Sequence, residues 1–132
     1  MHTNKRTIAA DKFFTGLFET ALEADEIVTK IEFPIPEKAG YAKFPNPASR
    51  YAIVGVMVAK TGGGVRVAVT GAGPCVFRVP EMEAALSKNF SADALKDVKV
   101  SADGLNSDIH ASAEYRANLI SVMAGRAVTA AA

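Results

Sequence analysis

The chain has 132 residues, which suits a single domain with a buried core, and 49% of its residues are hydrophobic. Its 15 basic and 14 acidic residues give a net charge of +1, which provides no basic footprint for nucleic acid. Cys75 is the only cysteine, which excludes an internal disulfide or a self-contained iron-sulfur ligand set and suits a reducing cytoplasm. No apolar run approaches the ~20 residues that a membrane-spanning helix requires. We therefore expect a cytoplasmic protein with no nucleic-acid partner and no membrane insertion.

The N-terminal part predicts a helical turn followed by a strand. In residues 9–22, Asp11 can cap a short turn and Gly16 can end it, and we expect the phenylalanines there to pack into the core. Residues 26–33 alternate between apolar and charged side chains, which predicts a half-buried strand. Pro34 and Pro36 would end it. The first residues show no N-terminal element of their own, as if the chain continued from a preceding segment.

The middle of the chain predicts an antiparallel sheet of three to four strands. A short strand over residues 41–44 leads into a loop of Pro, Asn and Ser residues. Residues 51–59 are almost continuously apolar and predict a central strand covered on both faces, in which Gly55 marks the close approach of a neighbour. Residues 61–64, TGGG, predict a hairpin connection into residues 65–71.

The second half of the chain changes to a helical period. Pro80 predicts the first position of a short helix, and Ser91 can cap a further turn. The longest helix is expected over residues 112–130, with a stripe facing the sheet. That stripe comprises Tyr115, Leu119, Val122 and Met123. Strands followed by about three helices on one face of the sheet predict the α+β class.

Several kinds of site are disfavoured by the sequence. The two histidines, His2 and His110, lack metal-ligand partners at suitable spacing. The GAGPCV segment, residues 71–76, lacks the third glycine of a dinucleotide fingerprint and follows a strand of an antiparallel hairpin. Cys75 is better interpreted as an inert thiol than as a reactive one. No catalytic residue and no metal ligand is predicted.

Lys43 and Tyr51 flank the loop in the middle of the chain and are the candidate binding residues. One interpretation is structural, with a solvated lysine at a strand end and an amphipathic tyrosine in the core. The other is functional, because a fixed ammonium beside a redox-active ring would favour its anionic reduced form, and an aromatic side chain would exclude water from the ring face. The residues alone leave both interpretations open.

Three stretches together resemble the C-terminal domain of the FAD-binding medium subunit of molybdenum hydroxylases, the family of carbon monoxide dehydrogenase and xanthine dehydrogenase. They are RTIAADKFFTGLFETALEADEIVTKIEFP, YAKFPNPASRYAIVGV and SDIHASAEYRANLISVMAGRAV. The resemblance covers nearly the whole chain and is strongest to carbon monoxide dehydrogenase-like medium subunits.

This resemblance implies an α+β domain, residues 1–132, within a three-subunit oxidoreductase. Its partners would be a molybdenum-binding large subunit, an iron-sulfur small subunit and an N-terminal FAD-binding domain that this chain lacks. FAD would pass electrons from the iron-sulfur subunit to an acceptor. In such proteins a lysine before this loop and a tyrosine after it lie beside the FAD ring, and Lys43 and Tyr51 stand at the matching positions. Alone, the chain is expected to be inactive and to bind FAD weakly or not at all.

An alternative is that the domain acts mainly in assembly. It would then dock onto the molybdenum and iron-sulfur subunits and carry no chemistry of its own. For the SDIHASAEYR segment we expect a structural role, in which Asp108 or Ser112 caps the last helix.

Overall fold

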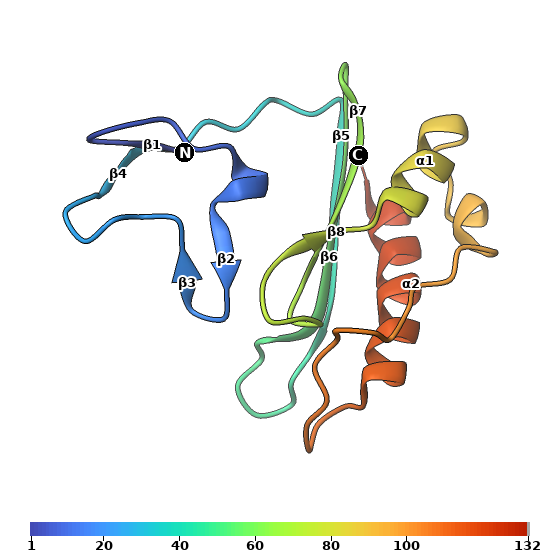
Figure 1. The fold of residues 1–132 in the computed structure, drawn as a ribbon. Helices are drawn as coiled ribbons and strands as arrows, with labels where there is room; N and C mark the ends of the chain where they lie inside the picture. The colour runs from blue at the N-terminus through green and yellow to red at the C-terminus, as the bar shows by residue number, and fades with distance from the viewer. Residues whose placement is uncertain (132) are drawn as a thin grey trace. The chain divides into compact units, whose positions relative to one another are not determined.

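The computed structural model describes residues 1–131 and contains two compact units, Met1–Ile35 and the part from Pro36 onward. In the first unit, β1 (His2–Thr3) pairs with β4 (Val28–Lys30), and β2 (Phe14–Gly16) pairs with β3 (Glu19–Thr20). The predicted turn is present as the 3-10 helix η1 (Ala10–Lys12). Each sheet of this unit has only two short strands, shown in blue in Figure 1.

Two predictions for this unit are wrong. The strand expected over residues 26–33 is limited to β4, whose three residues are all exposed. Phe13 is buried, but Phe14 is 47% and Phe18 98% exposed. A ribbon of two short strands offers no second layer against which an apolar face can pack.

A buried carboxylate organises the first unit. Glu26 is only 5% exposed and accepts hydrogen bonds from Arg6 Nε and Nη2, both at 2.9 Å, and from Thr3 Oγ1 at 2.6 Å. The Arg6 guanidinium and then the Thr3 hydroxyl lower the pKa of Glu26 from an ordinary value of 4.5 to about 2. Glu26 is therefore a buried carboxylate that stays charged. The alternating pattern of residues 26–33 had predicted a solvated side chain at this position.

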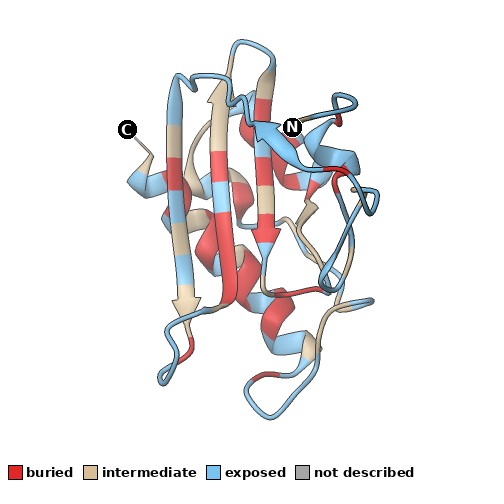
Figure 2. Cartoon of the chain, turned by 90° about the vertical axis from the view of Figure 1, so that its left-hand side faces the viewer, coloured by how far each residue is buried: buried red, intermediate tan, exposed pale blue. Residues whose placement is uncertain are grey.

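The second unit is a four-stranded antiparallel sheet with helices on one side (Figure 1). Its strands lie in the order β5-β6-β7-β8, and their bounds are Lys38–Pro45, Ala52–Thr61, Gly64–Thr70 and Phe77–Arg78. The TGGG hairpin is confirmed between β6 and β7. The α+β class is confirmed, and alternate residues of β7, namely Val65, Val67 and Val69, are buried. Figure 2 shows by colour how far each described residue is buried.

The helices are α1 (Pro80–Lys88), the 3-10 helix η2 (Ala92–Leu95) and α2 (Ala113–Ala130). The described residues thus form two α-helices instead of about three, because the turn after Ser91 is a short 3-10 segment with no side-chain cap. Pro80 does open α1, and Ser112 caps α2 by accepting a hydrogen bond from the backbone N–H of Tyr115.

The buried face of α2 is only partly the predicted stripe. Leu119 and Met123 are buried, whereas Tyr115 is 43% and Val122 39% exposed. Small residues bring the helix close to the sheet instead: a Cβ placed on Gly40 of β5 would lie 2.0 Å from the carbonyl oxygen of Ala127. A stripe of large apolar residues alone misses a face built from alanines.

Candidate functional site

The loop between β5 and β6 is held by Asn46, which is only 4% exposed. Its backbone N–H donates to the Tyr51 carbonyl at 2.8 Å, and its own carbonyl accepts from the Arg50 N–H at 2.9 Å. Its side-chain Oδ1 accepts from the N–H groups of Ala48 at 2.9 Å and Ser49 at 3.2 Å. One buried amide therefore fixes the turn that separates the two candidate residues.

Lys43 is tied to the other side of this loop. Its Nζ donates to the carbonyl oxygen of Arg50 at 2.8 Å. Arg50 has a φ of 64°, a left-handed conformation that is uncommon for a side chain other than glycine. The residue with the strained backbone, Arg50, is thus also the residue whose carbonyl binds the Lys43 ammonium, and it directly precedes Tyr51.

The structure places Lys43 and Tyr51 on opposite sides of one hydrogen-bonded turn, and both side chains are open to solvent. Tyr51 is 47% exposed, so the interpretation of Tyr51 as a core residue is wrong. An ammonium group has three donors, and the Arg50 carbonyl takes one of them. The other two can serve an acceptor such as the edge of a flavin, so the residues present fit that group at one edge.

Arg116 braces the sheet directly after this loop. It is only 2% exposed, and its Nη1 donates to the carbonyls of Ile53 at 2.8 Å and Gly71 at 3.1 Å. Its Nη2 lies 2.7 Å from Asp108 Oδ2. Its Nε has no partner among the described residues. Arg116 therefore joins the start of β6, the turn after β7 and the loop before α2.

The sequence predicted Asp108 or Ser112 as the cap of the last helix, and Ser112 takes that role, while Asp108 holds the loop before the helix. Asp108 Oδ1 accepts from the N–H groups of His110 at 2.9 Å and Ala111 at 3.1 Å. These bonds, the one from His110 first, together with Arg116, lower the pKa of Asp108. The SDIHASAEYR segment, which leads into α2, thus has a structural role.

Other classes of site find no geometry in the described part of the chain. The segment after β7 leads into β8 in an antiparallel pair, so it has no βαβ context for a dinucleotide. Residues 1–131 hold no group of three His, Cys, Asp or Glu side chains placed to bind a metal ion. None of the described helices is long and apolar enough to cross a membrane.

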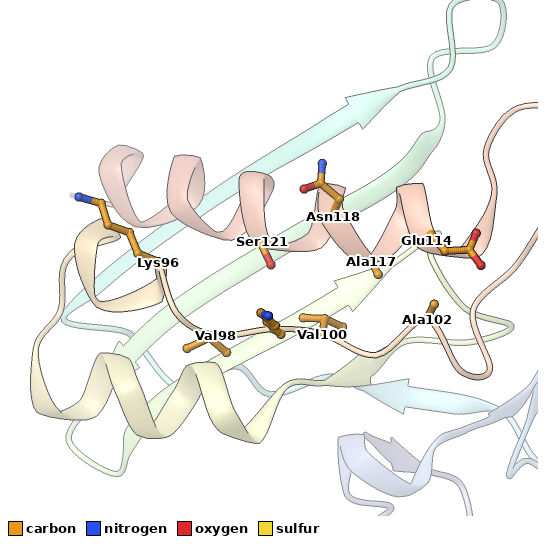
Figure 3. A pocket seen from close by; sticks show the side chains of 9 residues that line it. Lys96, Val98, Val100, Ala102, Glu114, Ala117, Asn118 and Ser121 are labelled. Carbon is orange, nitrogen blue, oxygen red and sulfur yellow. The ribbon is translucent and has the colours of Figure 1, made fainter.

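A shallow groove of about 440 Å³ lies along α2, remote in sequence from both candidate residues. Figure 3 shows it between α2 and the segment after η2. Lys96, Val98 and Val100 line one wall, and Asn118 and Ser121 line the other. Neither Lys43 nor Tyr51 contributes to it.

Comparison with known proteins gives the family. Residues 39–131, which fall within the unit that contains the four-stranded sheet, match the family described as CO dehydrogenase flavoprotein C-terminal domain. The chain belongs to this family. The resemblance seen in the sequence is thereby confirmed.

Similar CO dehydrogenase flavoprotein C-terminal domains occur in the medium subunits of several enzymes. The chain is 34% identical to the nicotine 6-hydroxylase medium subunit of Paenarthrobacter nicotinovorans, covering 96% of this chain and 48% of that one. It is 28% identical to the carbon monoxide dehydrogenase medium chain of Hydrogenophaga pseudoflava, again over 96% and 48%. The chain therefore spans about half the length of the curated relatives it matches.

Solved structures agree on the fold of this family member. The reconstituted CO dehydrogenase of Oligotropha carboxidovorans aligns with a TM-score of 0.74 at 24% identity, over 93% of this chain and 47% of that one. Quinoline 2-oxidoreductase from Pseudomonas putida 86 aligns with a TM-score of 0.73 at 24% identity, over 94% and 47%. These likenesses establish the fold.

Proposed function

We propose that this chain is the C-terminal part of the flavoprotein subunit of a molybdenum-containing hydroxylase or dehydrogenase, and that it forms one wall of the FAD site. The proposal rests on one observation in a chain of this family. The turn fixed by Asn46 is flanked by the exposed ammonium of Lys43 and the exposed phenol of Tyr51. The half of the medium subunit that this chain does not match, called here the flavin-carrying half, would supply the remaining contacts.

In this proposal FAD, when bound, supplies electron transfer between an iron-sulfur subunit and an acceptor. Lys43 would place its charge at one edge of the ring, where a positive charge in a partly desolvated site favours negative charge on the ligand. Tyr51 would cover part of the ring and exclude water. Partners would be a molybdenum-binding large subunit and an iron-sulfur small subunit, and the location would be the cytoplasm.

The experiment measures FAD retention by the medium subunit in which this chain and the flavin-carrying half are present together. Lys43→Ala with Tyr51→Ala should weaken FAD binding on the order of tenfold or more, as expected for the loss of one charge-assisted contact and one aromatic contact. Lys38→Ala, an exposed lysine on the same strand, serves as the control and should leave FAD binding unchanged. Unchanged affinity in the double variant would exclude these two residues from the site.

A second candidate function is docking onto the other subunits without a part in the flavin site. The groove along α2 favours it, because its lining carries two exposed lysines, Lys96 and Lys99, and one acidic residue, Glu114, and could receive an acidic segment of a partner. Lys96 also pairs with Asp93 at 2.8 Å, so Lys99 is the lysine with the freer charge. Retention of the large or small subunit by the immobilised chain, and its loss on Lys96→Glu with Lys99→Glu, would support this role. No retention by either subunit would count against it.

A further inference from the structure

One face of the four-stranded sheet is left uncovered by the helices of its own unit. The strand register places Lys43, Gly55 and Thr70 in one row and Tyr41, Met57 and Ala68 in the next. These rows alternate with Val56, Val58 and Val67, which are fully buried in the core shared with the helices. We call the surface formed by the two rows the outer face.

The outer face is apolar at its centre and basic at its ends. Tyr41 is 50% and Met57 40% exposed, although a solvated sheet face usually carries polar side chains. Lys43 lies at one end and Arg66 beyond the other, and β5, β6 and β7 contain no acidic residue. Exposed apolar surface with a charged rim marks a site of interaction between proteins.

Gly55 makes the centre of this face flat. A Cβ at this position would lie 2.5 Å from Tyr41 Oη and 2.8 Å from Thr70 Oγ1. The Tyr41 side chain therefore extends across β6 and covers the glycine, instead of standing up from the sheet. This is the close approach that the sequence predicted at Gly55. The result is a platform of one aromatic ring beside one methionine.

The position of Lys43 indicates what covers the platform. Lys43 is two residues from Tyr41 on the same strand, so both belong to the same face. A polypeptide that brings FAD to Lys43 must approach on this side, since the helices occupy the other side. The curated relatives are about twice as long as this chain, since the match covers 48% of each of them.

We propose that the outer face, centred on Tyr41 and Met57, is the surface on which the flavin-carrying half of the medium subunit packs. Apolar side chains of that half lie on the platform, and an acidic group meets the rim at Arg66, while Lys43 is kept for FAD. This inference rests on the proposed function and goes beyond it, because it assigns a protein interface to Tyr41, Met57 and Arg66, to which the proposed function gives no part in holding FAD.

The experiment is thiol footprinting in a Cys75→Ser background. Met57→Cys is compared with Val122→Cys, because Val122 on α2 is 39% exposed and so matches Met57 at 40%. Both variants are labelled with a maleimide, first in this chain alone and then in the medium subunit that also contains the flavin-carrying half. Labelling of Met57→Cys should slow on the order of tenfold or more in the assembled subunit, because thiol reactivity follows exposure, while Val122→Cys keeps its rate. Circular dichroism checks that both variants are folded.

Equal labelling of Met57→Cys in the two settings would overturn the proposal. Protection that appears only when the molybdenum subunit is added would also overturn it, as would protection in the isolated chain through self-association. The footprint is measured with and without FAD and in the Lys43→Ala, Tyr51→Ala variant. If Met57→Cys stays protected in that double variant and FAD retention is unchanged, the interface is correct and the assignment of Lys43 and Tyr51 to the flavin site is wrong.

Discussion

The guanidinium of Arg116 binds the carboxylate of Asp108 at 2.7 Å while its other terminal nitrogen holds two backbone carbonyls from the sheet. The Arg116 side chain is 2% exposed and the Asp108 side chain is 42% exposed, so the pair joins a buried cation to a carboxylate that is open to solvent. This pair connects the last helix to the strand that begins next to Tyr51. It is a source of stability that can be tested directly.

Replacing Arg116 should destabilise the second unit strongly. Arg116→Met keeps most of the aliphatic volume but removes the hydrogen bonds from the guanidinium to the Ile53 and Gly71 carbonyls and to Asp108 Oδ2, which should cost about 3 kcal/mol. Urea denaturation measures the change. Arg126→Met on the exposed side of the same helix is the control and should change the free energy of unfolding little. Equal losses in both variants would contradict the bracing role.

Removing the Asn46 side-chain oxygen should loosen the loop that carries the candidate residues. Asn46→Ala deprives the N–H groups of Ala48 and Ser49 of their acceptor and should lower the free energy of unfolding by about 1–2 kcal/mol. Asn46→Asp keeps an acceptor there and should lose less. Hydrogen exchange of the amides of residues 48–51 should quicken in Asn46→Ala but not in the exposed control Asn118→Ala. Unchanged exchange in Asn46→Ala would show that the loop is held by other contacts.

Two glycines should respond to alanine with opposite signs. Gly40→Ala places a methyl group against the Ala127 carbonyl and should destabilise the protein by about 3 kcal/mol through overpacking. Gly125 lies within α2 with nothing within 4 Å of an added Cβ, so Gly125→Ala should stabilise by about 0.5–1 kcal/mol. Thermal melting of the two variants tests the pair. A loss of stability in Gly125→Ala would contradict the packing of α2 described above.

Acid should unfold the first unit through Glu26. Its pKa is about 2 when folded and 4.5 ordinarily, so the unfolded state binds a proton first as the pH falls. The contribution of Glu26 is therefore fully present above pH 4.5 and is lost between pH 4.5 and 2. Amide chemical shifts of Met1–Ile35, followed by NMR during an acid titration, report this loss. Glu26→Gln should remove that part of the pH dependence, and an unchanged titration curve in this variant would exclude Glu26 as its cause.

The sheet was the part of the fold that sequence reasoning predicted best. The apolar run after Tyr51, the TGGG hairpin and the alternation in Val65, Val67 and Val69 each depend on near neighbours in the chain, and the central strand, the hairpin and the alternation are confirmed. The prediction of cover on both faces of the central strand is wrong, because Met57 is 40% exposed. The family resemblance was also readable, because its three stretches are spread over the whole chain. The contribution of Lys43 and Tyr51 to a flavin site stays a prediction.

What sequence reasoning missed depends on residues far apart in the chain. Arg116 is an unremarkable charged residue in a helix until the carbonyls of Ile53 and Gly71, 63 and 45 positions away, are placed beside it. The burial of Glu26 requires Arg6 and Thr3, which are 20 and 23 positions away in the chain. Asn46 is the exception, since an Asn between two prolines signals an Asx turn, and that signal could have identified the residue that fixes the loop.

The Tyr41 side chain that covers Gly55 links the two positions in evolution as well as in space. A side chain at position 55 has room only if the residue at position 41 becomes smaller or turns away and the Thr70 hydroxyl moves aside. Among medium subunits, we expect glycine at the position of Gly55 to accompany an aromatic residue at the position of Tyr41. Larger residues at the first position should accompany small ones at the second, a covariation that an alignment of the family can reveal without any new protein being made.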